Sequence, residues 1–370
     1  MQKRLFDVEA ILAPALPPAD SAPDREMRRR QIEARAALYP RIRFMGSKYK
    51  LATPLAEIFE SLPPGPSVDG FSGSGVVSYV LKATGRRVLA NDHLAFASAL
   101  TEALVANEGA TLSDSEIEWL CSPSADGRDF ISATFDGLYF PFADHAFLDA
   151  AWSHVDELSG PKRALAVSAL CLAAARKQPR GVFTVTTPRY DDGRRQMRMS
   201  LRALFREAAQ DLNQAVFRSV GQASESLCGD VFDIDPRGIA VAYLDPPYAP
   251  PKDDTCYIKR YHFLEGLATY WRGQEIMWDT KTRKLRKRHT PFAYKRSASD
   301  ALDRVFGHFR ESALVVSYGS NAALGADDVE GILKRHKRFV KRIDIAHRYA
   351  FGTHSTARRR EATEYVFVAT

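Results

Sequence analysis

Short apolar runs alternate with longer amphipathic stretches from about residue 41 onward. Apolar runs closed by Gly, Asp, Asn or Pro are typical of buried strands, whereas apolar positions three or four residues apart predict helices. Residues 67–94 therefore predict a strand, a glycine-rich turn, a helix and a second strand that ends at Asn91–Asp92. Further strands are predicted at 239–244, 312–318, 338–346 and 363–370. Strands that alternate with helices indicate the α/β class, with a doubly wound and largely parallel sheet.

The predicted strands fall into two groups, which a long and mostly helical stretch separates. We therefore expect an inserted region at 96–224 within a catalytic domain formed by 41–95 and 225–370. Residues 1–40 are Pro-rich and then highly charged, and they predict an N-terminal extension with a helix in which Asp24 is a candidate N-cap.

Charge and composition narrow the function. The net charge is +7 and the pI is about 9.2, which favours polyanions such as nucleic acid as partners. The four cysteines form no CxxC pair and the nine histidines form no HExxH motif, so we expect no metal. No segment approaches the roughly 18 apolar residues of a membrane span. The prediction is a cytoplasmic protein without a membrane partner.

The motif "DGFSGSG" (69–75) follows the first predicted strand. Its small residues allow a ligand to approach the backbone. Asp92 ends the next strand about twenty residues later, where an acid can accept hydrogen bonds from both ribose hydroxyls of an adenosine-type ligand. The alternative role for Asp92 is a helix cap. The spacing differs from G-x-G-x-x-G, and the chain has no GxxxxGK[ST], so neither a dinucleotide fingerprint nor a P-loop is present.

The motif "LDPPY" (244–248) follows a second apolar strand. Asp245 can accept a hydrogen bond from an amino group, and the two prolines offer a rigid backbone carbonyl. Tyr248 can stack on a flat heteroaromatic ring. Together these groups suit a grip on the exocyclic amine of a nucleobase, with a strand-ending turn as the alternative.

These two motifs and the upstream "RFMGSK" (43–48), in this order, resemble Dam-like, alpha-class N6-adenine DNA methyltransferases over roughly residues 41–370. The resemblance implies a Rossmann-like, doubly wound mixed sheet that binds S-adenosyl-L-methionine, with an inserted, mainly helical target-recognition domain. It implies methyl transfer to the N6 amino group of a flipped adenine in double-stranded DNA (EC 2.1.1.72), with S-adenosyl-L-homocysteine as the product and no metal. It also implies a bacterial or phage protein that associates with the nucleoid.

The resemblance assigns residue roles. Lys48 and its neighbours would contact the methionine carboxylate, Asp92 the ribose, and Asp230 of "CGDVFD" the adenine amino group of the cofactor. The full cofactor set is Met45, Gly46, Ser47, Lys48, Asp69, Phe71, Ser72, Gly73, Ser74, Gly75, Asp92, Asp230, Val231 and Asp245. The catalytic set is Asp245, Pro246, Pro247 and Tyr248.

Two basic regions are candidates for DNA contact. The first, residues 176–202, combines arginines with small polar residues. The second, residues 281–296, contains no acid, and a solvated loop is the alternative for it. Tyr261 and His262 could close the pocket of the flipped base or pack at the start of a helix. The predicted contacts are Arg180, Arg189, Arg194, Arg195, Tyr261, His262, Lys284, Arg286, Lys287 and Arg288.

Other functions remain open at this stage. They are N4-cytosine DNA methylation, RNA adenine or protein glutamine methylation, and a catalytically silent DNA-binding protein. The stretch "GVFTVTTPRY" (181–190) matches the recognition segment of the family only in part, so no DNA target sequence is predicted. A cognate restriction endonuclease is a candidate partner, and the chain is expected to be a monomer or a weak dimer.

Overall fold

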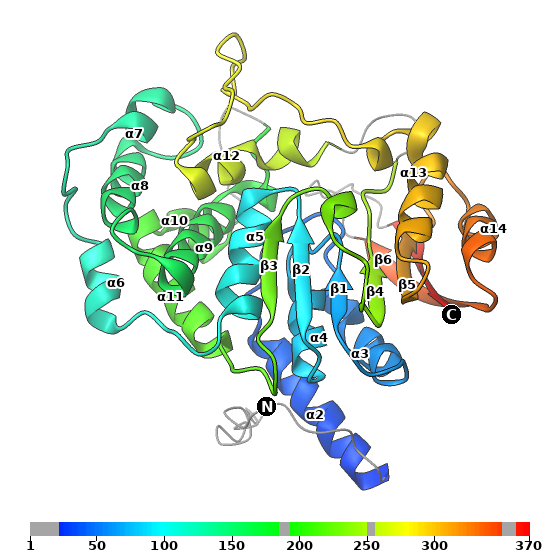
Figure 1. Ribbon diagram of the computed structural model, residues 1–370. Helices are drawn as coiled ribbons and strands as arrows, with labels where there is room; N and C mark the ends of the chain where they lie inside the picture. The colour runs from blue at the N-terminus through cyan, green and yellow to red at the C-terminus, as the bar shows by residue number, and fades with distance from the viewer. Residues whose placement is uncertain (1–21, 185–192, 250–255, 350–359) are drawn as a thin grey trace.

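A mixed sheet of seven strands forms the centre of the described structure (Figure 1). The computed structural model describes residues 22–184, 193–249, 256–349 and 360–370. The strand order is β3-β2-β1-β4-β5-β7-β6, in which β1 to β5 are parallel and β7 is antiparallel to both of its neighbours. The strands are β1 (Ser67–Asp69), β2 (Val88–Asp92), β3 (Glu225–Cys228), β4 (Val241–Leu244), β5 (Ala313–Gly319), β6 (Val340–Tyr349) and β7 (Arg360–Ala369). The predicted α/β class and the predicted strands are confirmed, with ends that differ by a few residues.

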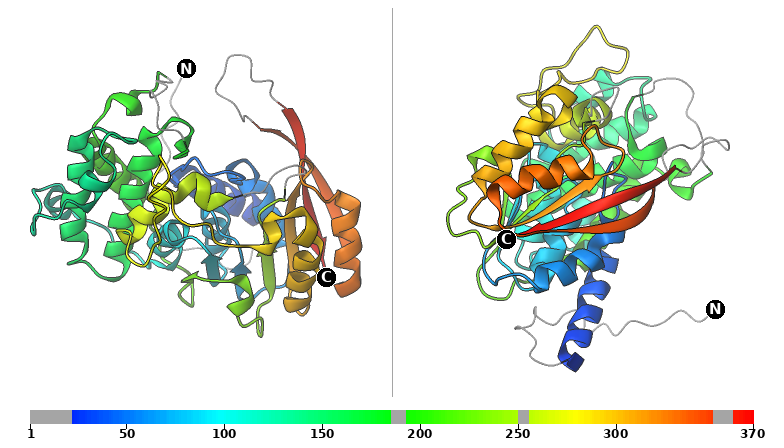
Figure 2. Two further views of the ribbon diagram at one scale, coloured as in Figure 1. Left: turned by 90° about the horizontal axis from the view of Figure 1, so that it is seen from above. Right: turned by 90° about the vertical axis from the view of Figure 1, so that its right-hand side faces the viewer.

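Alternate residues of the strands enter two different cores, because successive side chains of a strand point to opposite faces. Val68, Leu244 and Val316 pack with α13 (Lys295–His308) and α14 (Ala326–His336). Val88, Tyr243 and Val315 pack with α3 (Ala52–Glu60) and α4 (Val76–Ala83) on the other face. Figure 2 shows β6 and β7 as a long hairpin at one edge of the sheet, beside α14. Helices on both faces are the arrangement that a doubly wound sheet requires.

Helices occupy most of the chain between β2 and β3, and they lie beyond β3 in Figure 1. They share one hydrophobic core with the sheet, because α9 packs against α5 and against α12 (Tyr257–Thr269). The inserted region proposed at 96–224 is therefore separate in sequence, but its helices and the sheet pack into the same core. The helices are α5 (Ala95–Thr101), α6 (Asp114–Leu120), α7 (Phe130–Thr134), α8 (Phe142–Val155), α9 (Gly160–Lys177), α10 (Arg195–Arg198) and α11 (Leu201–Ala215).

The N-terminal helix α2 (Ala22–Leu38) packs along α3 and α4. Arg28 pairs with Glu60 at 2.6 Å and donates to the carbonyl of Thr84. Tyr39, at the end of this segment, is buried and donates to the carbonyl of Ser74 at 2.7 Å. Asp24 lies in the first turn of the helix, which starts at Ala22. The described part of the predicted extension thus supports the glycine turn directly.

A short hairpin at 275–286 follows α12 and projects from the molecule as the yellow segment at the top of Figure 1. Ile276 and Leu285 form its β-bridge, and the N–H of Met277 donates to the carbonyl of Lys284 at 2.9 Å. Leu285 is buried, which fixes the base of the hairpin. Among the described helices, none has the length and hydropathy needed to cross a membrane.

Candidate active site

The carboxyl ends of β1 and β4 lie side by side, with Asp69 opposite Tyr243. The chain runs from β1 to one side of the sheet and from β4 to the other, and α/β sheets bind ligands in the crevice at such a reversal. A pocket of about 990 Å³, including the part open to solvent, lies here. Its lining includes the predicted residues Met45, Gly46, Ser47, Lys48, Asp69, Phe71, Ser72, Gly73, Ser74, Asp92, Asp245, Pro247, Lys287 and Arg288.

Two aromatic side chains, Phe44 and Tyr39, lie against the glycines of the turn. Gly73 and Gly75 have φ angles of +51° and +77°, which side chains disfavour. A Cβ at Gly73 would lie 2.9 Å from the ring of Phe44, and one at Gly75 would overlap the hydroxyl of Tyr39. The positive φ angles and these close contacts therefore require glycine at both positions, in addition to any need for a ligand to approach the backbone.

Replacement of Gly75 by Ala should destabilise the protein more than the same change at Gly127. Both glycines have similar φ angles, +77° and +71°, but a Cβ at Gly127 meets nothing within 4 Å. Overpacking against Tyr39 should add about 1–3 kcal/mol to the loss. Urea denaturation of the two variants measures the difference, and equal losses would show that Tyr39 moves away without cost.

Asp92 connects the second strand to the glycine turn. Its Oδ2 accepts from the N–H of Gly73 at 2.7 Å, and its Oδ1 accepts from the N–H of Leu94 at 2.9 Å. Burial raises the pKa of Asp92 to about 6, although both N–H groups oppose the rise. Leu94 is the N-cap residue of α5, and the N–H of Phe96 in the first turn of that helix donates to Glu265. Asp92 therefore holds the turn before the helix rather than capping the helix, and its carboxylate lines the pocket.

Asp245 sits in a buried network with three other side chains. Its Oδ2 lies 2.7 Å from the Nζ of Lys48, and its Oδ1 accepts from the hydroxyl of Tyr248 at 2.7 Å. Lys48 and Tyr248 also reach Glu364 of β7, at 3.2 Å and 2.5 Å. Burial raises the pKa of Asp245, Lys48 opposes this rise, and the carboxylate of Glu364 adds to it.

Lys48 was expected to contact the methionine carboxylate of the cofactor, and here its ammonium group is bonded within the protein. Its ammonium group donates to the carbonyl of Gly46 at 2.8 Å in addition to the two carboxylates, which accounts for all three of its N–H groups. Burial would lower the pKa of Lys48, but Asp245 and Glu364 outweigh burial and hold the pKa above its ordinary value. In this conformation Lys48 therefore binds the carboxylate of Asp245 rather than facing an open position for a methionine carboxylate.

Five residues of the predicted cofactor and catalytic sets lie outside the lining of the pocket. Gly75 is the N-cap of α4, and Val231 is buried beneath Gly70. Asp230 is exposed and accepts from the N–H of Phe232 at 3.1 Å, so its present role is to cap the short helix Val231–Asp233. Pro246 is buried, and the ring of Tyr248 packs against Tyr318 at 4.8 Å. Residues outside the lining are Gly75, Asp230, Val231, Pro246 and Tyr248.

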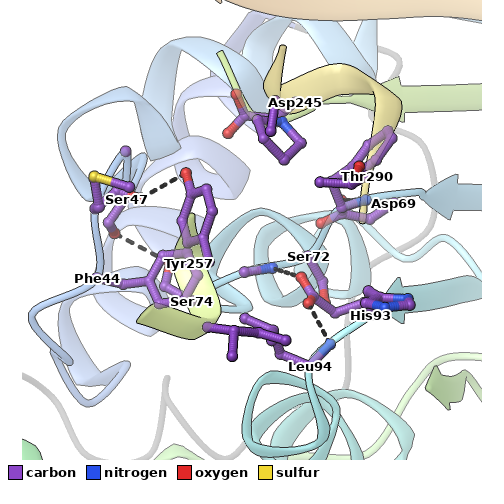
Figure 3. A pocket seen from close by; sticks show the side chains of 18 of the residues that line it. Phe44, Ser47, Asp69, Ser72, Ser74, His93, Leu94, Asp245, Tyr257 and Thr290 are labelled. Carbon is purple, nitrogen blue, oxygen red and sulfur yellow. Dashed lines mark hydrogen bonds between the residues drawn. The ribbon is translucent and has the colours of Figure 1, made fainter. Parts of the chain in front are cut away.

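Several residues of the site were missed. Tyr257 of α12 and Phe44 enclose one side of the pocket, with His93 and Thr290 on the other side (Figure 3). Aromatic residues at such positions match many core positions, so the sequence had no signal for them. Glu364 had a signal: it is a carboxylate directly before the apolar run 365–369, two residues from the buried Val366 and on the same face of the strand.

The hairpin brings the second basic region to the rim of the pocket. Lys287 and Arg288 line the pocket, and Lys284 and Arg286 lie in the hairpin itself. Arg288 is an anchor, because it donates to Glu265 and to the carbonyl of His93 and also to Gln274 at 2.8 Å. Its guanidinium therefore holds the hairpin at the pocket, which its assignment as a phosphate contact did not anticipate.

Tyr261 and His262 are buried in α12. The Tyr261 hydroxyl accepts from the N–H of Met45 at 2.7 Å, and the ring of His262 bonds to the carbonyl of Phe183 at 2.8 Å. Burial lowers the pKa of His262 to about 4. The structure favours the packing role that was left open for both residues, since neither presents its ring to a DNA base in this conformation.

The arginines of the first basic region have different positions. Arg194 donates to the carbonyls of Arg176 and Gln178, and Arg195 is exposed and pairs with Glu207 at 2.9 Å. The backbone of Arg180 lies in a short helix after α9, and Arg189 lies outside the described residues. A second depression is lined by both Arg194 and Arg195 together with Arg41, Arg43 and Arg176.

The charges of the pocket fit a cationic adenosine ligand. Asp69, Asp92 and Asp245 line the pocket at the ends of its strands together with buried Lys48, while the other two cations of the lining, Lys287 and Arg288, lie at the rim. S-adenosyl-L-methionine is a sulfonium cation with two ribose hydroxyls, and these carboxylates suit both features. Within the described ranges, no group of three or more His, Cys, Asp or Glu side chains is arranged to hold a metal ion.

Comparison with known proteins identifies the family. Residues 44–317 match the D12 class N6 adenine-specific DNA methyltransferases. The chain is 27% identical over 330 residues to the Type II methyltransferase M2.HphI of Haemophilus parahaemolyticus, which covers 84% of this chain and 92% of that protein. It is 30% identical over 96 residues to the Type II methyltransferase M.FokI of Planomicrobium okeanokoites, 26% of this chain and 14% of that protein. The chain therefore belongs to the D12 class of N6 adenine-specific DNA methyltransferases.

Proposed function

We propose that this chain moves the methyl group of S-adenosyl-L-methionine to the N6 amino group of an adenine that is flipped out of double-stranded DNA. The observation that carries this proposal is the position of Asp245 after β4, where its carboxylate is 17% exposed and lines the same pocket as Asp92 and the glycine turn. A hydrogen-bond acceptor for an amine thus stands beside a site that suits an adenosine cation.

The residues after β1 and β2 would bind and orient the cofactor. Asp92 would accept from the ribose hydroxyls, while Asp69 and the glycine turn would lie beneath the methionine moiety. Phe71 packs edge to face on Phe292 at 5.1 Å, which supports an apolar wall for the adenine. When bound, S-adenosyl-L-methionine supplies a methyl group on a sulfonium, which an amine accepts with loss of one proton while the sulfur keeps the bonding electron pair.

The Asp-Pro-Pro-Tyr segment acts on the base. Asp245 and the backbone carbonyl of Pro246 would each accept one N–H of the adenine amine. These bonds draw the nitrogen lone pair out of conjugation with the ring, so the amine becomes a better nucleophile. Tyr248 would stack on the base, for which its ring must turn away from Tyr318 and its hydroxyl must release Asp245.

Binding of the duplex requires a basic surface on the protein. Flipping a base out of the stack costs a few kcal/mol, and contacts to the DNA phosphates must offset this free energy. The hairpin supports this role: residues 275–288 contain six basic and two acidic residues and end at the rim of the pocket. The depression lined by Arg41, Arg43 and Arg176 is a second candidate for phosphate contact, although Asp211 pairs with Arg176.

Neutralisation of Lys284, Arg286 and Lys287 to Gln should weaken DNA binding by about 10- to 100-fold near 0.1 M salt and flatten its salt dependence. Each lost phosphate contact should reduce the slope of log K against log salt by about 0.9. Arg288 is kept because it anchors the hairpin. Trp278 is 57% exposed at the hairpin, while the other three tryptophans are buried or half-buried, so its fluorescence gives an independent signal of contact.

The matched control removes three exposed charges of α2, Arg25, Arg29 and Arg30, at the opposite end of the molecule (Figure 1). This variant should bind DNA with the wild-type slope. An unchanged slope in the hairpin variant, or no change in Trp278 fluorescence on DNA, would remove the hairpin from the interface.

The two named relatives support a place beside a restriction endonuclease with the same target sequence. Methylation would then protect the DNA of a bacterial or phage genome, and the protein would act in the cytoplasm as a monomer or a weak dimer. Genomic DNA from cells that express the chain should resist an endonuclease that cuts at the methylated sequence.

Genome-wide detection of modified bases in cells that express the wild-type chain tests the proposal. The expected result is N6-methyladenine in one sequence context, which also identifies the target. N4-methylcytosine in place of N6-methyladenine would change the acceptor, and the absence of modified DNA despite expression would favour an RNA acceptor or a silent DNA-binding protein.

A further inference from the structure

Glu364 is a fully buried carboxylate in the active site to which no role has yet been assigned. It lies on β7 opposite Gly319, the last residue of β5. Its Oε1 accepts from the hydroxyl of Tyr248 at 2.5 Å and lies 3.2 Å from the Nζ of Lys48. An unpaired buried carboxylate lowers the stability of the folded protein. Here Glu364 contacts Lys48 of the motif at 43–48 and Tyr248 of the motif at 244–248, which would surround the reacting amine.

The four side chains form a closed ring. Asp245 and Glu364 are two of its corners, and both Lys48 and Tyr248 bridge them. Tyr248 has a single hydroxyl proton, so it donates to one carboxylate at a time although both are within reach. Lys48 is bonded to both carboxylates and can strengthen one bond as the other lengthens.

The ring poses a problem for the reaction, because both oxygens of Asp245 are engaged. Lys48 lies on Oδ2 and Tyr248 on Oδ1, whereas the proposed mechanism requires Asp245 to accept from the adenine amine. Each oxygen has a second lone pair for the amine, but the ammonium ion and the hydroxyl weaken Asp245 as an acceptor while they stay bound. Both of these groups need another acceptor when they release Asp245, and Glu364 already contacts both.

We propose that Glu364 is a positioning residue for methyl transfer, which takes over Lys48 and Tyr248 when the target amine binds Asp245. The inference rests on the proposed function. Glu364 touches neither substrate nor cofactor; it acts through its two partners. Gly319 leaves room for the exchange, because a Cβ there would lie 2.9 Å from the ring of Tyr248.

The variant Glu364→Gln tests this role, because the amide keeps the shape and the acceptor for Tyr248 but cannot neutralise Lys48. Lys48 would then remain on Asp245 and compete with the amine. We expect the single-turnover rate of methylation to fall about 10-fold or more, with the Kd for S-adenosyl-L-methionine within about twofold of wild type.

The pH profile supplies a readout that a merely structural residue would not move. The charged and titratable groups that face Asp245 are Lys48, Asp69, Tyr243, Tyr248, Tyr257 and Glu364. Among them Glu364 raises the pKa of Asp245, so its neutralisation should move the acidic limb of the rate profile to lower pH. Asp149→Asn is the matched control: it neutralises a buried carboxylate that holds Ile131 and Tyr270 outside the pocket, and it should lower stability without moving the limb.

A double-mutant cycle with Lys48→Met covers the case in which Glu364→Gln folds poorly. If Glu364 acts through Lys48, the loss in the double variant should be smaller than the product of the two single losses. A folded Glu364→Gln protein with wild-type rate and wild-type pH profile, or strictly multiplicative losses in the cycle, would overturn the inference. An inactive wild-type protein would instead contradict the proposed function, so the two failures are distinguishable.

Discussion

Asp245→Ala should lose methyl transfer by about 10³-fold or more and keep its affinity for S-adenosyl-L-methionine within a few fold. The carboxylate is the acceptor that the proposed mechanism places at the amine, and Ala removes it without filling the pocket. In the proposed binding mode, cofactor affinity depends mainly on Asp92 and the glycine turn, and the hydrogen bond between Asp92 and Gly73 does not involve Asp245. Single-turnover methylation of duplex DNA and isothermal titration with the cofactor measure the two quantities separately.

The control for this prediction is Asp235→Ala. Asp235 is an exposed carboxylate that pairs with Arg237 at 2.6 Å and lies outside the lining of the pocket, so its removal should leave the rate unchanged. If Asp245 only shapes the turn after β4, Asp245→Ala would lose stability and retain a near wild-type rate. That outcome would reject its role at the amine and retain the family assignment.

Asp92→Ala should raise the Kd for S-adenosyl-L-methionine by about 10²-fold, because hydrogen bonds to a charged acceptor are worth about 1.5–3 kcal/mol each. The substitution removes the proposed acceptor for the ribose and releases the N–H of Gly73, so the turn beneath the cofactor also loses support. Asp92→Asn keeps one acceptor and should lose less. Isothermal titration gives the Kd, and the rise in Tm with added cofactor gives an independent estimate.

Glu116→Ala separates the two roles of Asp92, since Glu116 belongs to the capping box of α6, away from the pocket. Loss of this cap should reduce stability by about 1 kcal/mol and leave cofactor affinity intact. If Asp92→Ala behaved in the same way, with lower stability and an unchanged Kd, Asp92 would only support the turns at Gly73 and Leu94 and the ribose assignment would be wrong.

The motifs could be predicted from the sequence because each is a local pattern with a local reason. The turn at 69–75 needs small residues where the backbone has positive φ, and Asp245 follows an apolar strand that must end at the edge of a sheet. Parallel strands align their carboxyl ends, so the chemistry after β1, β2 and β4 was expected to meet. The pocket brings Asp69, Asp92 and Asp245 together in agreement with that expectation.

Contacts between distant segments could not be predicted in the same way. Lys48 was expected at the cofactor carboxylate, but it meets Asp245 and Glu364 because β7 inserts between β5 and β6 and brings its carboxylate to the site. Tyr261 and His262 have polar groups that could contact DNA, but both are buried. Tyr261 bonds to the backbone of residues 43 and 45, and His262 bonds to the carbonyl of Phe183. Arg288 appears as one charge in a basic run, yet its partner Glu265 lies on the preceding helix.

The sequence by itself determined the class of fold and the family, and it predicted most of the residues that line the pocket. Strand periodicity, glycine turns and the Asp-Pro-Pro-Tyr segment are properties of neighbouring residues. Only the tertiary structure decided which charges pair inside the site. Pairing of buried charges depends on distances of a few ångströms between segments that are far apart in the chain, and the order of strands in the sheet sets those distances.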